Sequence, residues 1–322
     1  MYSGRLWLMR ICVLGTGSIG SLILGALCST EHDLVAVSRG ETAMRLSTEG
    51  LVIHRHDGSI DMIPPTRFTV IDTDVQETLR GNVENSDFAI ICGKSGDTYD
   101  LARFSSKLLS TKGIALTVQN GLGNYEAIRE ILGSHRSMGG STTHGAWRDQ
   151  DGAVHWEGFG EMAIGSGESD PREDELSILS ALVSAGLNPR WTVKLQTTIW
   201  TKAMINVAIN PICAIAGITN GDIESNPKLL SLSFEAANEV ASVGHAHGVD
   251  MSALDIEETV LGVIRSTSEN KCSMLQDVMA GRPTEIDQLC GRVTEIAETH
   301  GIPAPINTTL LALIKGIEGT NR

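Results

Sequence analysis

One segment near the middle of the chain combines an apolar helix pattern with three polar side chains that could bind a small molecule. The segment KAMINVAINP, residues 202–211, carries Lys202, Asn206 and Asn210 at every fourth position. Residues four apart share one face of an α-helix, and the remaining residues are apolar enough to be buried. Burying a cation and two amides without partners costs several kcal/mol. We therefore expect this stripe to face a binding cleft, the alternative being that it only pairs two helices.

Two later segments add polar groups of the same kind. Asn220 lies at a turn in ITNGDI, and Glu285 follows a helix break in SMLQDVMAGRPTEID. Thr284 with Asp287 three residues later has the spacing of a helix N-cap, which predicts Glu285 in a first helical turn. The helix dipole would favour the ionised carboxylate there.

The N-terminal residues have the pattern of a dinucleotide-binding unit. A short apolar run at residues 11–14 precedes G-x-G-x-x-G, an amphipathic helix pattern and a second apolar run, DLVAVSR. The first glycine permits a tight turn, the second lets the backbone approach a pyrophosphate, and the third allows close packing of helix and strand. The following helix N-terminus supplies amide donors. This pattern predicts a cofactor-binding loop, rather than a turn without a ligand, at Gly15, Thr16, Gly17, Ser18, Ile19 and Gly20.

The end of the second apolar run indicates which cofactor binds. An NAD enzyme usually has Asp or Glu there to accept a hydrogen bond from the ribose 2′-hydroxyl. Ser38 and Arg39 occupy this position instead, and a hydroxyl with a guanidinium suits a 2′-phosphate. The residues favour NADPH/NADP+, although Arg39 could also be a solvated loop residue.

Further strands are expected along the first half of the chain. DFAIICGK and IALTVQNGLG predict buried strands that lead to Lys94 and Asn120, where a doubly wound sheet binds its ligands. Residues 51–63 alternate around Asp57-Gly58 and predict a hairpin inserted in the wound sheet. Residues 141–165 predict a polar turn with antiparallel strands, in which His144 is more simply a structural hydrogen-bonding residue than a catalyst.

The pattern changes to helices after Pro189. Helical periodicity with Gly or Pro stops covers residues 197–210, 231–248, 256–281 and 284–301, and Pro211 should end or kink the first of these helices. We expect an α/β protein with an N-terminal Rossmann-type doubly wound sheet plus a C-terminal all-α domain. The expected domains are an NADP-binding Rossmann domain at residues 1–190 and an all-helical substrate-binding, catalytic domain at residues 191–322.

Composition excludes several other classes of protein. The chain has 322 residues, a net charge of −14 and six scattered cysteines without a C-x-x-C pair. A chain with this net negative charge lacks the basic surface that binds nucleic acid. Scattered cysteines are typical of a protein in the reducing cytoplasm and not of a disulfide framework. The histidines lack metal-ligand spacing, so we expect no metal site. Residues 11–28 are uncharged and could pass for a signal peptide, but their glycine spacing assigns them to the nucleotide loop, and no membrane contact is expected.

Together these motifs resemble the ketopantoate reductase (2-dehydropantoate 2-reductase) family. The similar segments run in order from about Met9, after an eight-residue extension, to the final helix: ICVLGTGSIG, NGLG at 120–123, STTHGA, WTKAMINVAINP, NG at 220 and SMLQDVMAGRPTEID. The resemblance implies an oxidoreductase that reduces ketopantoate to pantoate with NADPH, a step towards pantothenate and coenzyme A. Its partner would be a small-molecule 2-oxo acid.

The resemblance also implies roles for the residues at the matching positions. Lys202 would be the general acid that protonates the ketone oxygen, and Glu285 would be the second catalytic residue, binding the substrate hydroxyl and supporting the lysine. Lys94 would lie beside the nicotinamide, with Asn120 near both cofactor and substrate. The substrate-binding residues implied are Asn120, Asn206, Asn210, Asn220 and Ser273.

The sequence is also compatible with two other functions. A reductase of another 2-oxo acid would share the lysine and asparagine stripe and differ around Ser273 and Glu285. A non-catalytic NADP-binding sensor would keep the glycine loop but have no use for Lys202 opposite Glu285. The sequence leaves both a monomer and a homodimer open.

Overall fold

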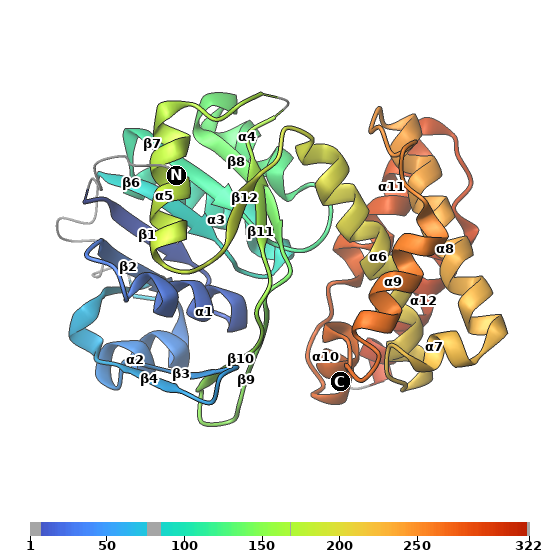
Figure 1. Ribbon diagram of the computed structural model, residues 1–322, viewed down its shortest axis with the longest axis horizontal. Coiled ribbons are helices and arrows are strands. Elements are labelled where there is room, and N and C mark those ends of the chain that lie inside the picture. The colour runs from blue at the N-terminus through green and yellow to red at the C-terminus, as the bar shows by residue number, and fades with distance from the viewer. Residues whose placement is uncertain (1–7, 76–84, 168, 321–322) are drawn as a thin grey trace. The chain divides into compact units, whose positions relative to one another are not determined.

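The computed structural model describes residues 8–75, 85–167 and 169–320, which form two compact units (Figure 1). The first unit is Met1–Gln119 with Asn124–Leu195, and the second is Asn120–Gly123 with Gln196–Arg322. The first is a mixed α/β unit and the second is helical, which confirms the predicted fold class. Residues 1–7 of the extension expected before Met9 lie outside the described residues.

The first unit is built on an eight-stranded sheet. Its strands lie in the order β12 (Pro189–Trp191), β11 (Met162–Gly165), β8 (Ser137–Thr142), β7 (Leu109–Thr117), β6 (Ser86–Ile91), β1 (Arg10–Leu14), β2 (Asp33–Ser38) and β5 (Thr69–Asp72). The strands from β8 to β5 run parallel, whereas β11 pairs antiparallel with β8 and parallel with β12. Crossovers between the parallel strands bring helices onto the sheet, as this topology requires.

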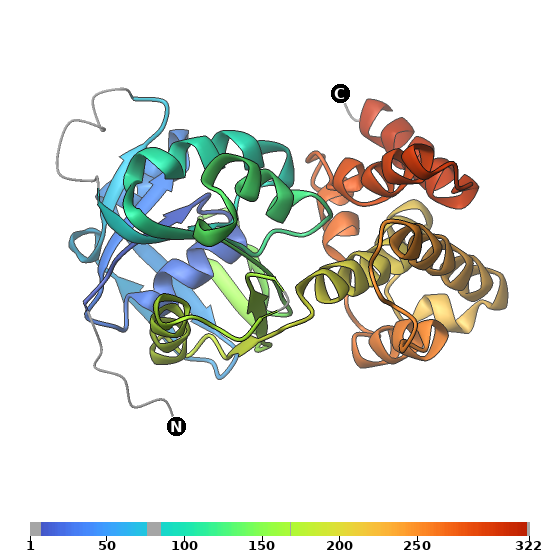
Figure 2. The same cartoon turned by 90° about the horizontal axis from the view of Figure 1, so that it is seen from above.

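Alternating strand residues pack against helices on both faces of this sheet. Ile11 and Val13 of β1 join one core with residues of α1 (Ser18–Leu27) and α5 (Glu173–Ser184). Cys12 and Leu14 join the other core with residues of α3 (Thr98–Leu108) and α4 (Asn124–Leu132). Figure 2 shows α3 and α4 on the opposite side of the sheet from α5. Because both faces are covered, the central strands are apolar throughout.

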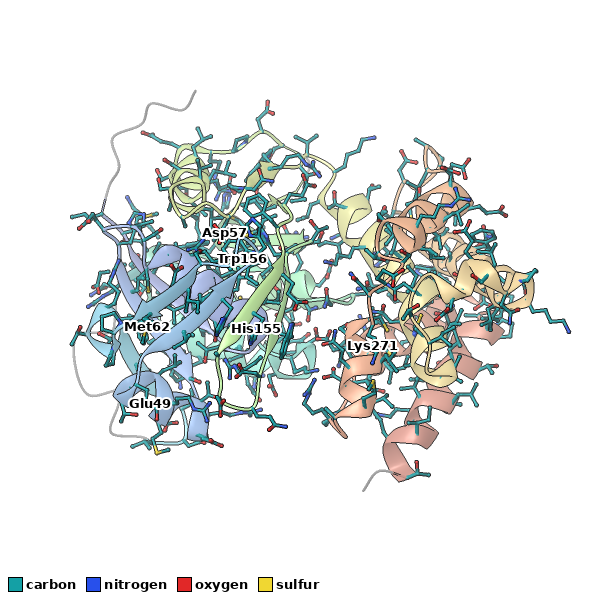
Figure 3. All side chains as sticks on the ribbon, turned by 60° about the horizontal axis from the view of Figure 1, so that its bottom comes forward. Glu49, Asp57, Met62, His155, Trp156 and Lys271 are labelled. Atoms are coloured by element: carbon teal, nitrogen blue, oxygen red, sulfur yellow. The ribbon has the colours of Figure 1, made fainter. Side chains whose placement is uncertain are left out.

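The hairpin expected at residues 51–63 forms, but it belongs to a second sheet and not to the wound sheet. This four-stranded sheet has the order β4 (Ile60–Ile63), β3 (Leu51–Arg55), β10 (Val154–Gly158) and β9 (Gly145–Arg148). Consecutive residues of β10 face opposite sides: Trp156 is buried, whereas His155 stacks on Trp147 at 4.1 Å between ring centroids (Figure 3). The inner face of this sheet packs against α1.

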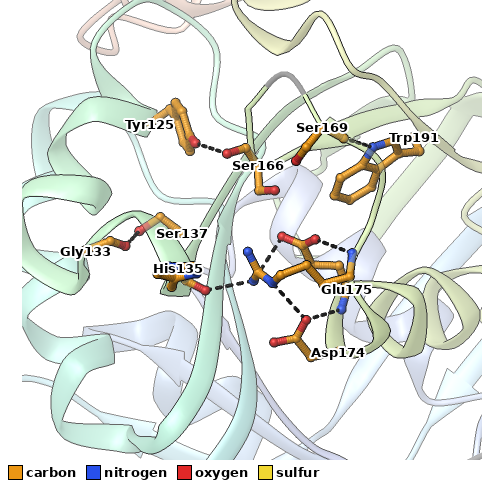
Figure 4. Close-up of polar contacts among 10 residues, drawn as sticks. Tyr125, Gly133, His135, Ser137, Ser166, Ser169, Asp174, Glu175 and Trp191 are labelled. Carbon is orange, nitrogen blue, oxygen red and sulfur yellow. Dashed lines mark hydrogen bonds and ion pairs between the residues drawn. The ribbon is translucent and has the colours of Figure 1, made fainter.

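Hydrogen bonds between side chains and backbone groups fix the segments at the far edge of the main sheet (Figure 4). The backbone N–H of Arg172 donates to the Glu175 carboxylate at 2.8 Å, which caps α5, and the Arg172 guanidinium donates to the His135 carbonyl at 2.8 Å. The Tyr125 hydroxyl donates to the carbonyl of Ser166 at 2.7 Å. Among the described residues, this unit also contains α2 (Gly40–Thr48), η1 (Pro65–Arg67), η3 (Ser95–Asp97) and η4 (Ser134–Arg136).

The second unit is a helical bundle. Its elements are α6 (Leu195–Ala216), α7 (Asp222–Ser225), α8 (Pro227–Ala246), α9 (Ile256–Ser266), α10 (Ser273–Met279), η5 (Ile286–Gln288), α11 (Cys290–His300) and α12 (Pro305–Thr320). The stretch 256–281, predicted as one helix, is divided into α9 and α10. The helix α6 continues past Pro211, which therefore does not end it but leaves the Val207 carbonyl without its helical donor.

The apolar residues of α6 form the centre of the bundle core. Ala203, Met204, Val207 and Ala208 are almost completely buried among residues of the other helices. Within the described residues, α6 alone is long and apolar enough to cross a membrane by length and composition, but 61% of its most apolar window is buried inside the protein. Such burial is typical of a core helix and does not indicate a membrane span.

Candidate active site

The polar stripe of α6 lies at the edge of the bundle core. Lys202 and Asn206 are partly buried, and Asn210 is buried. Burial lowers the pKa of Lys202 to about 8, while the carboxylate of Glu285 acts in the opposite direction. A lysine with this pKa is still mostly protonated at pH 7, yet it can release its proton far more readily than a solvated lysine.

Glu285 is held opposite this lysine by a neighbouring amide. Asn120 Nδ2 donates to Glu285 Oε2 at 3.2 Å, across 165 residues of sequence. The segment around Asn120 is fixed to the second unit, because the backbone N–H of Leu122 donates to the Gln288 carbonyl at 3.0 Å. Gly121 has a φ of +91°, and a Cβ there would lie 2.6 Å from that same carbonyl oxygen. Only glycine allows this approach, which places Asn120 beside Glu285.

The predicted helix N-cap at Thr284 is wrong. Glu285 precedes the short 3-10 turn η5, and α11 begins only at Cys290. The Thr284 backbone N–H and hydroxyl both donate to the Glu318 carboxylate, at 2.7 and 2.8 Å. Glu318 in turn pairs with Lys315 at 3.1 Å. A residue of α12 therefore fixes the backbone just before Glu285.

The other amides predicted to bind substrate lie in two places. The carbonyl of Asn210 accepts a hydrogen bond from the Cys272 thiol at 3.5 Å, which brings it next to the exposed Ser273 at the start of α10. Asn220 is buried, and its amide donates to the Thr267 hydroxyl at 2.9 Å. Asn220 thus has a structural contact in addition to any contact with a ligand.

The glycine loop has the close contacts that its sequence pattern predicts. Gly15 has a φ of +85°, and a Cβ there would lie 2.4 Å from the backbone nitrogen of Gly93. At Gly20 a Cβ would lie 2.1 Å from the Gly15 carbonyl oxygen. By contrast, a Cβ at Gly17 would meet no atom within 4 Å. Two glycines are thus required by packing, and the exposed Gly17 leaves open space at the N-terminus of α1.

Ser38, the last residue of β2, contacts this loop, and Arg39 follows it in the chain. The Thr16 hydroxyl donates to the Ser38 hydroxyl at 2.7 Å, so buried Ser38 fixes the loop. The side chain of Arg39 is 72% exposed and lies 3.4 Å from the Asp97 carboxylate. An exposed ion pair at this distance contributes little stability.

Lys94 lies on a turn that packs against the glycine loop through Gly93. Gln119, at the end of the strand that follows β6 in the sheet, donates from Nε2 to the carbonyls of Gly93 at 2.8 Å and Lys94 at 3.2 Å. Gln119 was not among the predicted site residues. The only feature of the sequence that points to Gln119 as a site residue is its position in the run Gln119-Asn120-Gly121 at a strand end.

His144 has the structural role expected of it. Its Nε2 lies 3.0 Å from the Leu187 carbonyl, and its Nδ1 accepts a hydrogen bond from the Gly160 backbone at 3.0 Å. Both ring nitrogens are therefore used by the backbone. Across residues 8–75, 85–167 and 169–320, no group of three or more His, Cys, Asp or Glu side chains is arranged to hold a metal.

Solved structures of reductases and dehydrogenases share this architecture. The chain superposes on a PanE/ApbA family ketopantoate reductase from Ralstonia eutropha with a TM-score of 0.85 and 22% identity, covering 97% of this chain and 99% of that one. It superposes equally well, with a TM-score of 0.85 and 19% identity, on D-mandelate dehydrogenase in complex with NADH and anilino(oxo)acetate, covering 97% and 99% of the two chains. The chain therefore has the same fold as these two proteins.

Sequence similarity assigns the chain to one family. Residues 11–169 match the family described as Ketopantoate reductase PanE/ApbA, and residues 194–318 match its C-terminal domain. The 2-dehydropantoate 2-reductase of Pyrococcus horikoshii is 34% identical over 312 residues, which cover 96% of this chain and 98% of that protein. The chain belongs to the ketopantoate reductase family. As a member of a reductase family it is an oxidoreductase that uses a nicotinamide cofactor and a small-molecule substrate.

Proposed function

We propose that this protein is a cytoplasmic 2-dehydropantoate 2-reductase that uses NADPH to make pantoate for coenzyme A biosynthesis. Residues 1–190 would form the NADP-binding domain and residues 191–322 the substrate-binding, catalytic domain. One observation carries the proposal: within the second unit, the partly buried Lys202, whose pKa is lowered to about 8, interacts with the charge of the Glu285 carboxylate, which in turn accepts a hydrogen bond from Asn120. An acid poised near neutral pH beside an oriented carboxylate suits the reduction of a ketone.

Lys202 is the general acid in this mechanism. When bound, the reduced nicotinamide supplies a hydride to the ketone carbon, and negative charge develops on the ketone oxygen. The Lys202 ammonium stabilises that charge and transfers its proton to the oxygen, which yields the alcohol. In the oxidation direction neutral Lys202 would take the proton back.

Glu285 positions both the substrate and the lysine. Its carboxylate can accept a hydrogen bond from the substrate hydroxyl, and its negative charge keeps Lys202 protonated against the effect of burial. The hydrogen bond from Asn120 fixes the orientation of that carboxylate. Asn206, Asn210, Asn220 and Ser273 are neutral donors and acceptors, which can hold the substrate carboxylate and hydroxyl without adding charges that would shift the pKa of Lys202.

The first unit has residues that fit a phosphorylated dinucleotide. Open space at Gly17 and the amides of Ser18 and Ile19 at the start of α1 suit a pyrophosphate. Ser38 and exposed Arg39 at the end of β2 suit a 2′-phosphate, since no carboxylate occupies the position that NAD enzymes use for the 2′-hydroxyl. Lys94, on the turn that packs against Gly15, would lie beside the nicotinamide.

The test is NADPH and NADH oxidation by the purified protein with 2-dehydropantoate and a panel of other 2-oxo acids. We expect the highest kcat/KM for 2-dehydropantoate with NADPH. A clear preference for another 2-oxo acid would assign the chain to a different reductase with the same fold, a possibility favoured by the superposition on D-mandelate dehydrogenase. Nucleotide binding without turnover of any 2-oxo acid would instead indicate a sensor.

A further inference from the structure

A buried arginine contacts the glycine loop from a strand of the other sheet. Arg148 is the last residue of β9 and follows Trp147, which faces outward. Because successive strand residues face opposite sides, Arg148 points inward, towards α1. Its Nη2 donates to the Thr16 carbonyl and, at 2.7 Å, to the Ser21 hydroxyl, with a longer contact of 3.4 Å to the Gly17 carbonyl.

These contacts fix the peptide planes of the loop. A trans peptide is planar, and its C=O and N–H point in opposite directions. Arg148 holds the Thr16 carbonyl on its own side, and the Gly17 carbonyl points the same way because it also accepts the first helical hydrogen bond of α1, from the Ser21 N–H at 2.9 Å. The N–H groups of Gly17 and Ser18 therefore point to the opposite side. Those two N–H groups lie at the N-terminus of α1, where a pyrophosphate needs its donors.

The guanidinium joins further parts of the nucleotide site. Its Nη1 donates to the Thr42 hydroxyl at 3.3 Å, in the first turn of the helix that follows Arg39. The Ser21 hydroxyl donates to the Thr16 carbonyl at 2.9 Å, so arginine and serine hold the same oxygen. Arg148 therefore links α1, the glycine loop and α2.

The charge of Arg148 is also unusual for its position. Burial lowers its pKa, and in the described part of the chain it forms no ion pair with a carboxylate. Its neighbour Asp149 accepts instead from His155 Nε2 at 2.9 Å. Its Nε is buried and, among the described residues, has no hydrogen-bond partner. A partly desolvated cation beside the positive end of α1 is unfavourable until an anion arrives.

We infer that Arg148 is a positioning residue for the nicotinamide nucleotide, holding the glycine loop in its binding conformation and adding positive charge on the side of the loop that faces away from the pyrophosphate. The inference rests on the proposed function of the loop, since it requires that a nucleotide binds there. It predicts that Arg148 contributes to nucleotide affinity and not to the proton-transfer step.

The experiment compares Arg148→Gln and Arg148→Lys with the wild-type protein. Dissociation constants are measured by calorimetry for NADPH, for ADP-ribose, which contains the pyrophosphate, and for adenosine 2′-monophosphate, which does not. In Arg148→Gln we expect about 10- to 100-fold weaker binding of NADPH and ADP-ribose, the effect of losing hydrogen bonds from a charged donor. Binding of adenosine 2′-monophosphate should change less than about threefold, and kcat at saturating NADPH should be nearly unchanged. Arg148→Lys keeps the charge but not the forked geometry, so its affinity should be intermediate.

Arg45→Gln is the matched control. Arg45 is a nearby cation that pairs with Glu41 at 3.0 Å, and its removal should leave ADP-ribose binding within about twofold of wild type. Wild-type affinity for ADP-ribose in Arg148→Gln, or equal weakening of both fragments, would overturn the inference. If Arg148→Gln does not fold, unchanged ADP-ribose binding in Arg148→Lys overturns it instead. A wild-type protein that binds neither NADPH nor NADH would refute the proposed function itself.

Discussion

The substitution Glu285→Gln tests whether the second catalytic residue acts through its charge. Glutamine keeps the shape of the side chain and can still accept from Asn120, but it removes the negative charge that keeps Lys202 protonated. With a pKa of about 8, Lys202 is roughly nine-tenths protonated at pH 7 and about one-tenth protonated at pH 9. The wild-type kcat for ketone reduction should therefore fall about tenfold per pH unit above this pKa.

Removing the carboxylate should move this alkaline limb to lower pH. Loss of one nearby opposite charge shifts a pKa by roughly one unit or more. In Glu285→Gln the fall in the rate of ketone reduction should then begin near neutral pH. Oxidation of the alcohol needs neutral lysine, so its rate should rise from the same lower pH. Since Glu285 would also bind the substrate hydroxyl, KM should increase while NADPH affinity stays near the wild-type value.

The assay is steady-state turnover in both directions from pH 6 to 10, together with calorimetric NADPH titration. Asp287→Asn is the control, because Asp287 is an exposed carboxylate two residues away that pairs with Lys315 at 2.8 Å. Its alkaline limb should coincide with that of the wild type. A Glu285→Gln limb that stays at about pH 8, or moves up, would show that the charge of Glu285 does not keep Lys202 protonated. If NADPH binding were lost as well, Glu285 would have a role in the structure of the domain and not in catalysis.

Three further substitutions test the nucleotide site. Arg39→Ala should weaken NADPH binding by about 1.5–3 kcal/mol, the value of a hydrogen bond to a charged group, and leave NADH binding unchanged; equal losses would show that Arg39 does not contact the phosphate. Gly20→Ala should lower the unfolding temperature and abolish nucleotide binding, because its Cβ would lie 2.1 Å from the Gly15 carbonyl oxygen. Gly17→Ala should keep the wild-type unfolding temperature, since its Cβ meets only open space, but bind NADPH more weakly. A Gly17→Ala protein with full affinity would argue against pyrophosphate binding at this loop.

Local patterns in the sequence predicted much of this structure. The apolar run, glycine spacing and amphipathic helix at residues 11–27 depend on neighbours within a few residues, so strand, turn and helix could be read directly. The fourfold spacing of Lys202, Asn206 and Asn210 likewise needs only helical periodicity.

Features that depend on distant contacts could not be predicted in this way. The hairpin at residues 51–63 was recognised, but its membership in a separate sheet depends on pairing between Ile53 and Val154. The 3-10 turn after Glu285 forms where Thr284 is held by Glu318, which lies 34 residues after Thr284. The contact of Arg148 with the glycine loop spans 132 residues, and no local pattern marks this arginine.

The effect of Lys202→Ala on kcat tests directly whether this lysine is the proton donor. Removing the ammonium leaves the developing alkoxide without a proton donor, and general acid catalysis contributes roughly 10²–10⁴-fold. We predict a loss of kcat of that order, an alkaline limb that disappears, and NADPH affinity close to wild type. Lys271→Ala, which removes an exposed lysine of the same unit, should match the wild type. A folded Lys202→Ala protein with near-normal kcat and the same alkaline limb would show that Lys202 is not the proton donor.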